Sequence, residues 1–161
     1  MPANKNWRRW IHASAGEYLS DTAMAESLPW LIEGITDRDE DFMSKPDRVE
    51  IRLNGPFTLR YGNCWNARVF INVIVSSAVG EIKDAYKLDE VLGVFHTAMD
   101  QPIEIFKRGD GPDDDDSSIG CLHPLGERST PIRVLDFGEV DPVDHIRQGM
   151  VTGTYEIELT N

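Results

Sequence analysis

The chain has 161 residues, of which 40% are hydrophobic, and it carries a formal net charge of −12 at pH 7. This length suits one domain, residues 1–161, that buries roughly two-thirds of the surface its unfolded form would expose. The excess of acidic residues, with a pI near 4.6, argues against a surface that binds nucleic acid through its phosphates. Cys64 and Cys121 are too few for a disulfide framework, and no apolar run approaches the roughly 18 residues that span a bilayer. We therefore expect a protein of the reducing cytosol without a membrane-spanning helix.

The first expected element is a helix near the amino end, with Asn4 or Asn6 as its N-terminal cap. Arg8 and Arg9 lie beside tryptophans in this segment, a combination that also occurs in nucleic-acid sites. A helix that packs its tryptophans and shows its arginines to water explains the pattern better. The apolar residues at helical spacing are Trp7, Trp10, Ile11, Ala15, Tyr18 and Leu19.

A short apolar segment, residues 28–35, precedes a polar loop, residues 36–47, in which aspartates alternate from Asp37 on. This alternation suggests a calcium loop. An EF-hand loop needs glycine at its sixth position and glutamate at its twelfth, where this chain has Phe42 and Arg48. We therefore expect a solvated loop.

Alternating apolar residues predict a series of strands after this loop. Residues 48–53 and 57–61 are expected as two half-buried strands separated by the turn Asn54-Gly55-Pro56. A second turn at Gly62-Asn63 leads into residues 65–77, which are apolar on much of both faces. This long strand should be central, or covered by a helix on one side.

A second helix is predicted after the long strand, with Asp84 as its cap and Gln101-Pro102 as its end. The strand 103–106 then enters an acidic turn and returns through 119–122, so the turn is the tip of a hairpin. The apolar stripe of the helix consists of Tyr86, Leu88, Val91, Leu92, Phe95 and Met99.

Two more strands, residues 132–137 and 150–159, are expected near the carboxyl end. Their connection should hold a short helical piece at 143–146, and the second strand should bulge near Gly153. The expected fold class is α+β, a mostly antiparallel β-sheet packed by two main helices.

The common catalytic motifs are absent from the sequence, including the phosphate-binding loop, the Gly-x-Ser-x-Gly elbow and the zinc-binding His-Glu-x-x-His helix. Cys121 and His123 could join Cys64 or His145 around zinc, or act as a thiol and base. Paired Cys-x-x-Cys spacing is missing, and isolated cysteines and histidines in strands are usually packing residues. No catalytic residue, metal site or cofactor is therefore assigned.

The acidic turn is the most distinctive segment of the sequence. It carries five carboxylates that repel one another unless solvent, a cation or a basic partner relieves them. Magnesium or calcium could bind weakly, but consecutive residues rarely converge on one ion, so a solvated face is the better interpretation. We expect the turn to be an exposed tip that faces an assembly partner or a lumen through Asp110, Asp113, Asp114, Asp115 and Asp116.

Spaced motifs along nearly the whole chain resemble those of small structural proteins of tailed bacteriophages, and the tail terminator proteins of long-tailed phages fit best. The amino-terminal half contributes Trp7-x-x-Trp10-Ile11-x-Ala13-Ser14, Leu28-Pro29-x-x-Ile32-Glu33-Gly34, Arg52-Leu53-Asn54-Gly55-Pro56 and Ile71-Asn72-Val73. The remainder contributes Phe106, Gly109-Asp110-Gly111-Pro112, Ile119-Gly120-Cys121-Leu122, Phe137-Gly138 and Gly153-Thr154-Tyr155.

This resemblance implies an α/β subunit that assembles as a ring, usually a hexamer, caps the finished tail tube and joins it to the head or neck. It implies a virion protein, assembled in the host cytoplasm, whose partners are its own copies, the tail tube protein and a neck or connector protein. DNA would pass through the lumen without sequence-specific binding, and neither cofactor nor catalysis is implied.

Two alternatives remain at the level of the sequence. A head-to-tail connector, or neck ring, is the nearest one. A metal-dependent hydrolase that uses Asp113 to Asp116 with His123 is the rival from a different class. The acidic turn could line a ring's lumen, where negative charge repels passing DNA, or meet a basic patch on a neighbouring ring.

Overall fold

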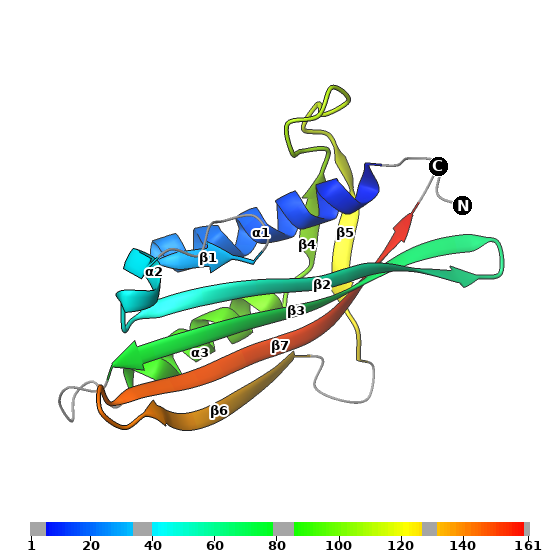
Figure 1. Cartoon of the computed structure of the whole chain (residues 1–161). Helices are drawn as coiled ribbons and strands as arrows, with labels where there is room; N and C mark the ends of the chain where they lie inside the picture. The colour runs from blue at the N-terminus through cyan, green and yellow to red at the C-terminus, as the bar shows by residue number, and fades with distance from the viewer. Residues whose placement is uncertain (1–5, 34–39, 79–85, 127–131, 160–161) are drawn as a thin grey trace.

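The computed structural model describes residues 6–33, 40–78, 86–126 and 132–159, which form the expected α+β fold around a curled sheet (Figure 1). The helices are α1 (Trp7–Ala25), α2 (Glu40–Ser44) and α3 (Lys87–Met99). The strands are β1 (Trp30–Ile32), β2 (Arg48–Tyr61), β3 (Cys64–Ala78), β4 (Ile103–Phe106), β5 (Ser118–Pro124), β6 (Ile132–Asp141) and β7 (Ile146–Leu159). Within the described ranges, no helix is both long enough and apolar enough to cross a membrane.

The sheet has the strand order β1-β2-β3-β7-β5-β4, and β6 also pairs with β7. Among the strands of the described ranges, only β1 and β2 pair in parallel; the other strand pairs are antiparallel. The chain-terminal strand β7 thus lies in the middle of the sheet. It pairs with β3 over its whole length on one side and with β6 and then β5 on the other.

Helices α1 and α3 pack on one face of the sheet, and the core lies between them and the strands. β3 supplies that face with Val69, Ile71, Val73 and Val75, all at most 1% exposed. Their period of two, against the period of three to four in α1 and α3, builds the core as the sequence predicts. The prediction of β3 as a central strand covered by helices is confirmed.

The predicted N-terminal cap of α1 is not formed by a side chain. Asn6 stands at the cap position, but its amide donates to Asp113 Oδ2 over 3.2 Å and no helix N–H bonds to its side chain. A partner on a distant loop therefore replaces the local capping bond. The other two predicted caps, Asn4 and Asp84, lie outside the described residues.

Residues 48–61 form one strand, so the predicted turn at 54–56 is wrong. Gly55 and Pro56 stand opposite a single residue of β3, which makes a bulge rather than a chain reversal. His12 Nε2 lies 2.9 Å from the carbonyl oxygen of Gly55 and ties the bulge to α1. The described part of the predicted loop 36–47 also differs, because it contains the short helix α2.

The carboxyl-terminal hairpin differs from its prediction in two ways. β6 continues to Asp141, whose carboxylate accepts the backbone N–H of Val143 and of Asp144 at 3.0 and 3.1 Å, so a tight turn replaces the predicted helical piece. Gly153 is paired with both β3 and β6, which leaves no extra residue for a bulge there. The register shifts lie in β6 instead, between 136 and 138 and between 139 and 141.

Candidate functional site

The acidic turn forms a folded loop, residues 107–117, between β4 and β5, and it rises beside the first turns of α1 (Figure 1). Backbone hydrogen bonds close it: Lys107 N–H donates to Ser117 O over 2.9 Å, and Asp116 N–H donates to Lys107 O over 3.2 Å. Ser14 of α1 holds the base of the loop, because its hydroxyl accepts the Phe106 N–H at 2.8 Å. The prediction that this segment is a hairpin tip is confirmed.

Asp114 binds directly to α1 instead of facing solvent. Its Oδ1 accepts Arg9 Nη2 at 2.7 Å and the indole N–H of Trp10 at 2.6 Å. Its Oδ2 accepts the backbone N–H of Gly111 at 2.8 Å. The Asp114 side chain is 9% exposed, so the expectation of a fully exposed acidic tip is wrong for this residue. Sequence patterns could not predict this contact, because Arg9 and Trp10 lie more than one hundred positions from Asp114 in the chain.

Gly111 lets the loop approach Arg9 this closely. A Cβ on Gly111 would stand 1.9 Å from Arg9 Nη2, well inside any real contact distance. Lys107 adds a second cationic contact, with Nζ 5.6 Å from the centre of the Trp10 ring. The basic aromatic cluster at the start of α1 therefore binds the chain's own acidic loop.

The remaining carboxylates of the loop point to different partners. Asp115 accepts the Ser117 hydroxyl at 2.6 Å. Asp116 accepts Arg108 Nε at 2.9 Å, and the same guanidinium donates to Glu17 of α1 at 2.7 Å. Asp110, Asp113, Asp115 and Asp116 are exposed, as predicted. Four successive aspartates thus diverge, which relieves their mutual repulsion without an ion.

The hydrogen bonds of the loop favour ionised carboxylates. Burial of Asp114 opposes ionisation, but the bonds from Trp10, Gly111 and Arg9 outweigh it and lower the pKa of this carboxyl below its usual value. The hydroxyl and backbone N–H of Ser117 lower the pKa of Asp115 in the same way. The loop is therefore a preformed anionic structure at neutral pH.

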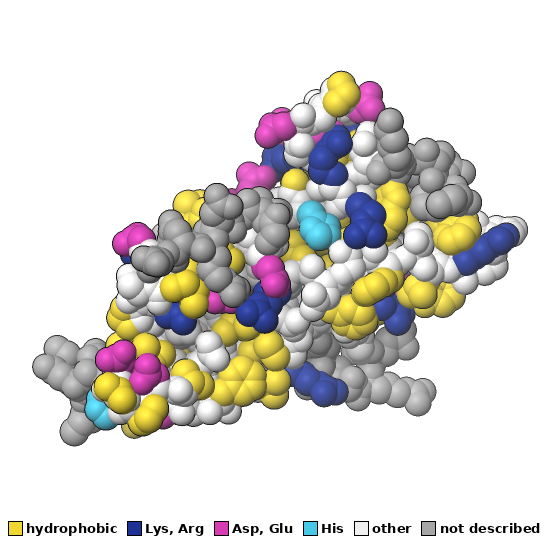
Figure 2. Space-filling view, viewed as in Figure 1, with side chains coloured by type: hydrophobic (Ala, Val, Ile, Leu, Met, Phe, Trp, Pro, Cys, Tyr) yellow, Lys and Arg dark blue, Asp and Glu magenta, His cyan; other side chains and the backbone are white. Residues whose placement is uncertain are grey.

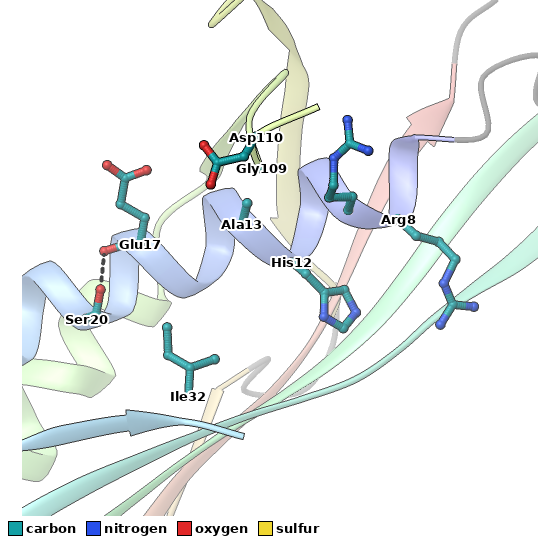
Figure 3. Close-up of a pocket in the computed structure, with 9 residues that line it drawn as sticks. Arg8, His12, Ala13, Glu17, Ser20, Ile32, Gly109 and Asp110 are labelled. Carbon is teal, nitrogen blue, oxygen red and sulfur yellow. Dashed lines mark hydrogen bonds between the residues drawn. The ribbon is translucent and has the colours of Figure 1, made fainter. Parts of the chain in front are cut away.

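A groove of about 650 Å³ runs along α1 below the loop. Figure 3 shows Ala13 and Ile32 inside it, with Arg8 and Glu17 at its ends and Asp110 above. A carbonyl oxygen only accepts, so the His12 bond to Gly55 places a proton on Nε2 and gives the imidazole a structural role. The groove is largely apolar and offers space rather than a paired nucleophile and base.

The isolated cysteines and histidines are not gathered into one site. β3 begins at Cys64 and β7 begins just after His145, at opposite ends of the sheet, while Cys121 and His123 lie on β5 (Figure 1). Across the described ranges, no three His, Cys, Asp or Glu side chains are placed to hold a metal ion. The zinc and hard-cation alternatives therefore have no assembled ligand set in these ranges.

Two further surfaces were missed at the sequence level. The first, the arm surface, covers the projecting end of the β2–β3 hairpin; the second, the β6 surface, covers β6 and its turn into β7. Figure 2 shows hydrophobic and basic side chains together over the hairpin, and hydrophobic and acidic ones together at the lower left. The arm surface consists of Phe57, Tyr61, Arg68 and Phe70 on one face of the hairpin and of Arg60 on the opposite face, where it lies over Trp65. The β6 surface consists of Val134, Leu135, Asp136, Phe137, Glu139, Val140, Asp141, Val143 and Asp144.

The exposed apolar side chains on both surfaces are large. Phe57 and Phe70 are 54% and 39% exposed and meet edge to face, with ring centres 6.0 Å apart. Phe137 and Val143 are 50% and 84% exposed. A signal for these surfaces exists in the sequence: residues 52–70 carry three arginines and no carboxylate, and residues 134–145 carry four carboxylates and no lysine or arginine.

No protein-family model and no curated protein sequence matches this chain. A solved structure of a protein whose name states no function has a similar fold, with a TM-score of 0.57 and 13% sequence identity over 96% of both chains. At this identity the similarity concerns the fold alone. It extends over nearly the full length, so the arrangement of helices and strands is shared with a known structure.

Proposed function

We propose that this chain is a non-enzymatic ring subunit of a phage virion, the tail terminator that caps the tail tube and joins it to the head or neck. The observation that carries the proposal is the pair of exposed apolar surfaces at opposite ends of one sheet. Exposed patches of this kind mark contacts with other proteins. A subunit with two such ends suits a closed assembly of copies.

The edges of the sheet support the same proposal. Among the described strands, β6 pairs only with β7, and β1 covers β2 only at 49–51. Unpaired strand edges present backbone donors and acceptors that a second chain can bind. Together with the fold class and the spaced motifs that resemble tail terminators, these edges favour assembly over catalysis.

The hydrolase hypothesis finds less support in the described geometry. It requires the carboxylates of Asp113 to Asp116 to converge with His123. Instead Asp113 binds Asn6, and Asp114 binds Arg9 and Trp10. If Asp-to-Asn changes at 113–116 abolished a measurable turnover while particles still assembled, the structural role would be wrong.

Electron microscopy of particles made without this protein tests the proposed role. A terminator predicts tails of uncontrolled length, since nothing stops growth of the tube. Tails of normal length beside unjoined heads would identify a connector instead. Normal, joined particles would refute both roles, and the same phage supplied with the wild-type chain serves as the control.

A further inference from the structure

We infer that the arm surface of one copy binds the β6 surface of a second copy, head to tail. This inference rests on the proposed ring function and names the two faces that would build the ring. The partner is a second copy of this chain. Three independent properties of the described residues support the pairing: apolar area, charge and position.

Apolar area is available on both sides of the contact. The arm offers Phe57, Tyr61 and Phe70, of which Tyr61 is 52% exposed. The β6 surface offers side chains of similar exposure, Val134 at 45% and Val140 at 49%. Burying such side chains against each other removes apolar area from water on both copies, which favours association.

The charges of the two surfaces are opposite in sign. Arg60 is exposed, donates to Gly62 O at 2.9 Å, lies 5.7 Å from the centre of the Trp65 ring, and forms no salt bridge with a carboxylate of the described ranges. Arg68 contributes a second guanidinium, which is paired with Glu156 at 2.8 Å. On the other side, Asp136 is paired with Arg147 at 2.7 Å and Glu139 lies 3.4 Å from His145, while Asp141 and Asp144 form no salt bridge within the described ranges. Complementary potentials steer encounter and disfavour the like-charged pairings of arm with arm or β6 with β6.

Position makes the contact heterologous. The β2–β3 hairpin projects at one end of the sheet, whereas the β6–β7 turn lies at the other end (Figure 1). One copy therefore cannot satisfy its own arm with its own β6 surface. Repeating an unlike contact of this kind produces a ring when the rotation between copies closes, and a filament when it does not.

Two double variants and their mixture test the pairing. The arm variant is Phe57→Ser with Phe70→Ser, and the β6 variant is Phe137→Ser with Val140→Ser. All four side chains are exposed, so the fold should survive the changes. Tyr86→Ser removes a comparably exposed side chain, 69%, outside both surfaces and serves as the matched control.

The measurement is the solution mass at high micromolar concentration, with circular dichroism to check folding. We expect rings for the wild type and for Tyr86→Ser, and monomers for each double variant alone. An equimolar mixture of the two double variants should double the mass, because one intact arm meets one intact β6 surface.

Rings formed by either double variant would overturn the inference, as would a mixture that stays monomeric or a monomeric wild type. Dimers formed by one double variant alone would indicate a contact between two identical surfaces and would also overturn the inference. The tail-length phenotype is read on particles and does not depend on which faces touch. A failed pairing therefore leaves the proposed function standing, whereas normal tails without the protein refute the function by itself.

Discussion

Asp114 is the residue whose surroundings differ most from those expected of an acidic turn. Its ionised carboxylate accepts three hydrogen bonds from Arg9, Trp10 and Gly111, and its pKa is lowered in the folded state. A lowered pKa adds stability that is present above the unfolded value, about 3.9 for aspartate. This contribution is lost as the pH falls through the lowered pKa of the folded form.

The Asp114→Asn variant should therefore be less stable than the wild type at pH 7, and the gap should narrow as the pH falls below the unfolded pKa of about 3.9. Urea unfolding across this range measures it. Asp110→Asn is the matched control, since it lies in the same loop, is exposed, and has a positive φ of 59° that asparagine tolerates. A gap that does not change with pH would show that the charge of Asp114 does not hold the loop.

Tyr155 links β7 to α3 in the core. It is fully buried, its hydroxyl donates to the Met99 carbonyl at the end of α3, and burial raises the pKa of this phenol. Tyr155→Phe leaves a buried carbonyl without this donor, so we expect a loss of about 1–3 kcal/mol in the free energy of unfolding. Tyr86→Phe, at an exposed position, should change it little, and equal effects of the two variants would contradict this account.

At the scale of elements, the packing of α3 on β7 depends on Gly149. A Cβ there would stand 2.6 Å from Leu92 Cδ1 and 3.1 Å from the Leu135 carbonyl oxygen. Helix α3 lies directly over this glycine, so an added methyl group must displace the Leu92 side chain and crowd the backbone of β6. Gly93, on the exposed side of the same helix, has nothing within 4 Å of the corresponding position.

Two alanine substitutions should therefore act in opposite directions. Gly149→Ala is expected to destabilise the fold by about 1–3 kcal/mol through overpacking. Gly93→Ala should stabilise it by roughly 0.5–1 kcal/mol, because alanine is the better helix former. Thermal unfolding of both variants checks the pair. A stabilising Gly149→Ala would mean that α3 does not rest on β7 in this way.

At the scale of the whole molecule, the net charge of −12 sets how the chain meets DNA. The two arginines beside the acidic loop, Arg9 and Arg108, are already paired with Asp114 and Asp116. We expect no detectable binding of double-stranded DNA at physiological salt, even within the non-specific range of about 10⁻⁴–10⁻⁶ M. Fluorescence anisotropy of labelled DNA measures this binding. Binding that weakens steeply with salt would show that the chain has a phosphate-binding surface and would contradict the prediction.

The predictions that held depend on short-range patterns. The helical spacing around Trp10 and Leu19 predicted α1, and the alternation of Val69, Ile71 and Val73 predicted β3, because each pattern repeats within a few residues. The predictions that failed depend on contacts across the chain. The bulge at Gly55 and Pro56 is shaped by pairing with β3, and the turn after Asp141 is held by a side-chain bond that spacing does not reveal.

Local patterns in the sequence suffice to predict the fold class, the main helices and long strands, and the acidic tip of the β4–β5 hairpin, since periodicity and turn chemistry are local. Three features became visible in the folded chain alone: β7 enters between β3 and β5, Asp114 binds α1, and exposed apolar side chains stand at opposite ends of the sheet. These features require residues far apart in the chain to meet, and such meetings follow from packing rather than from spacing.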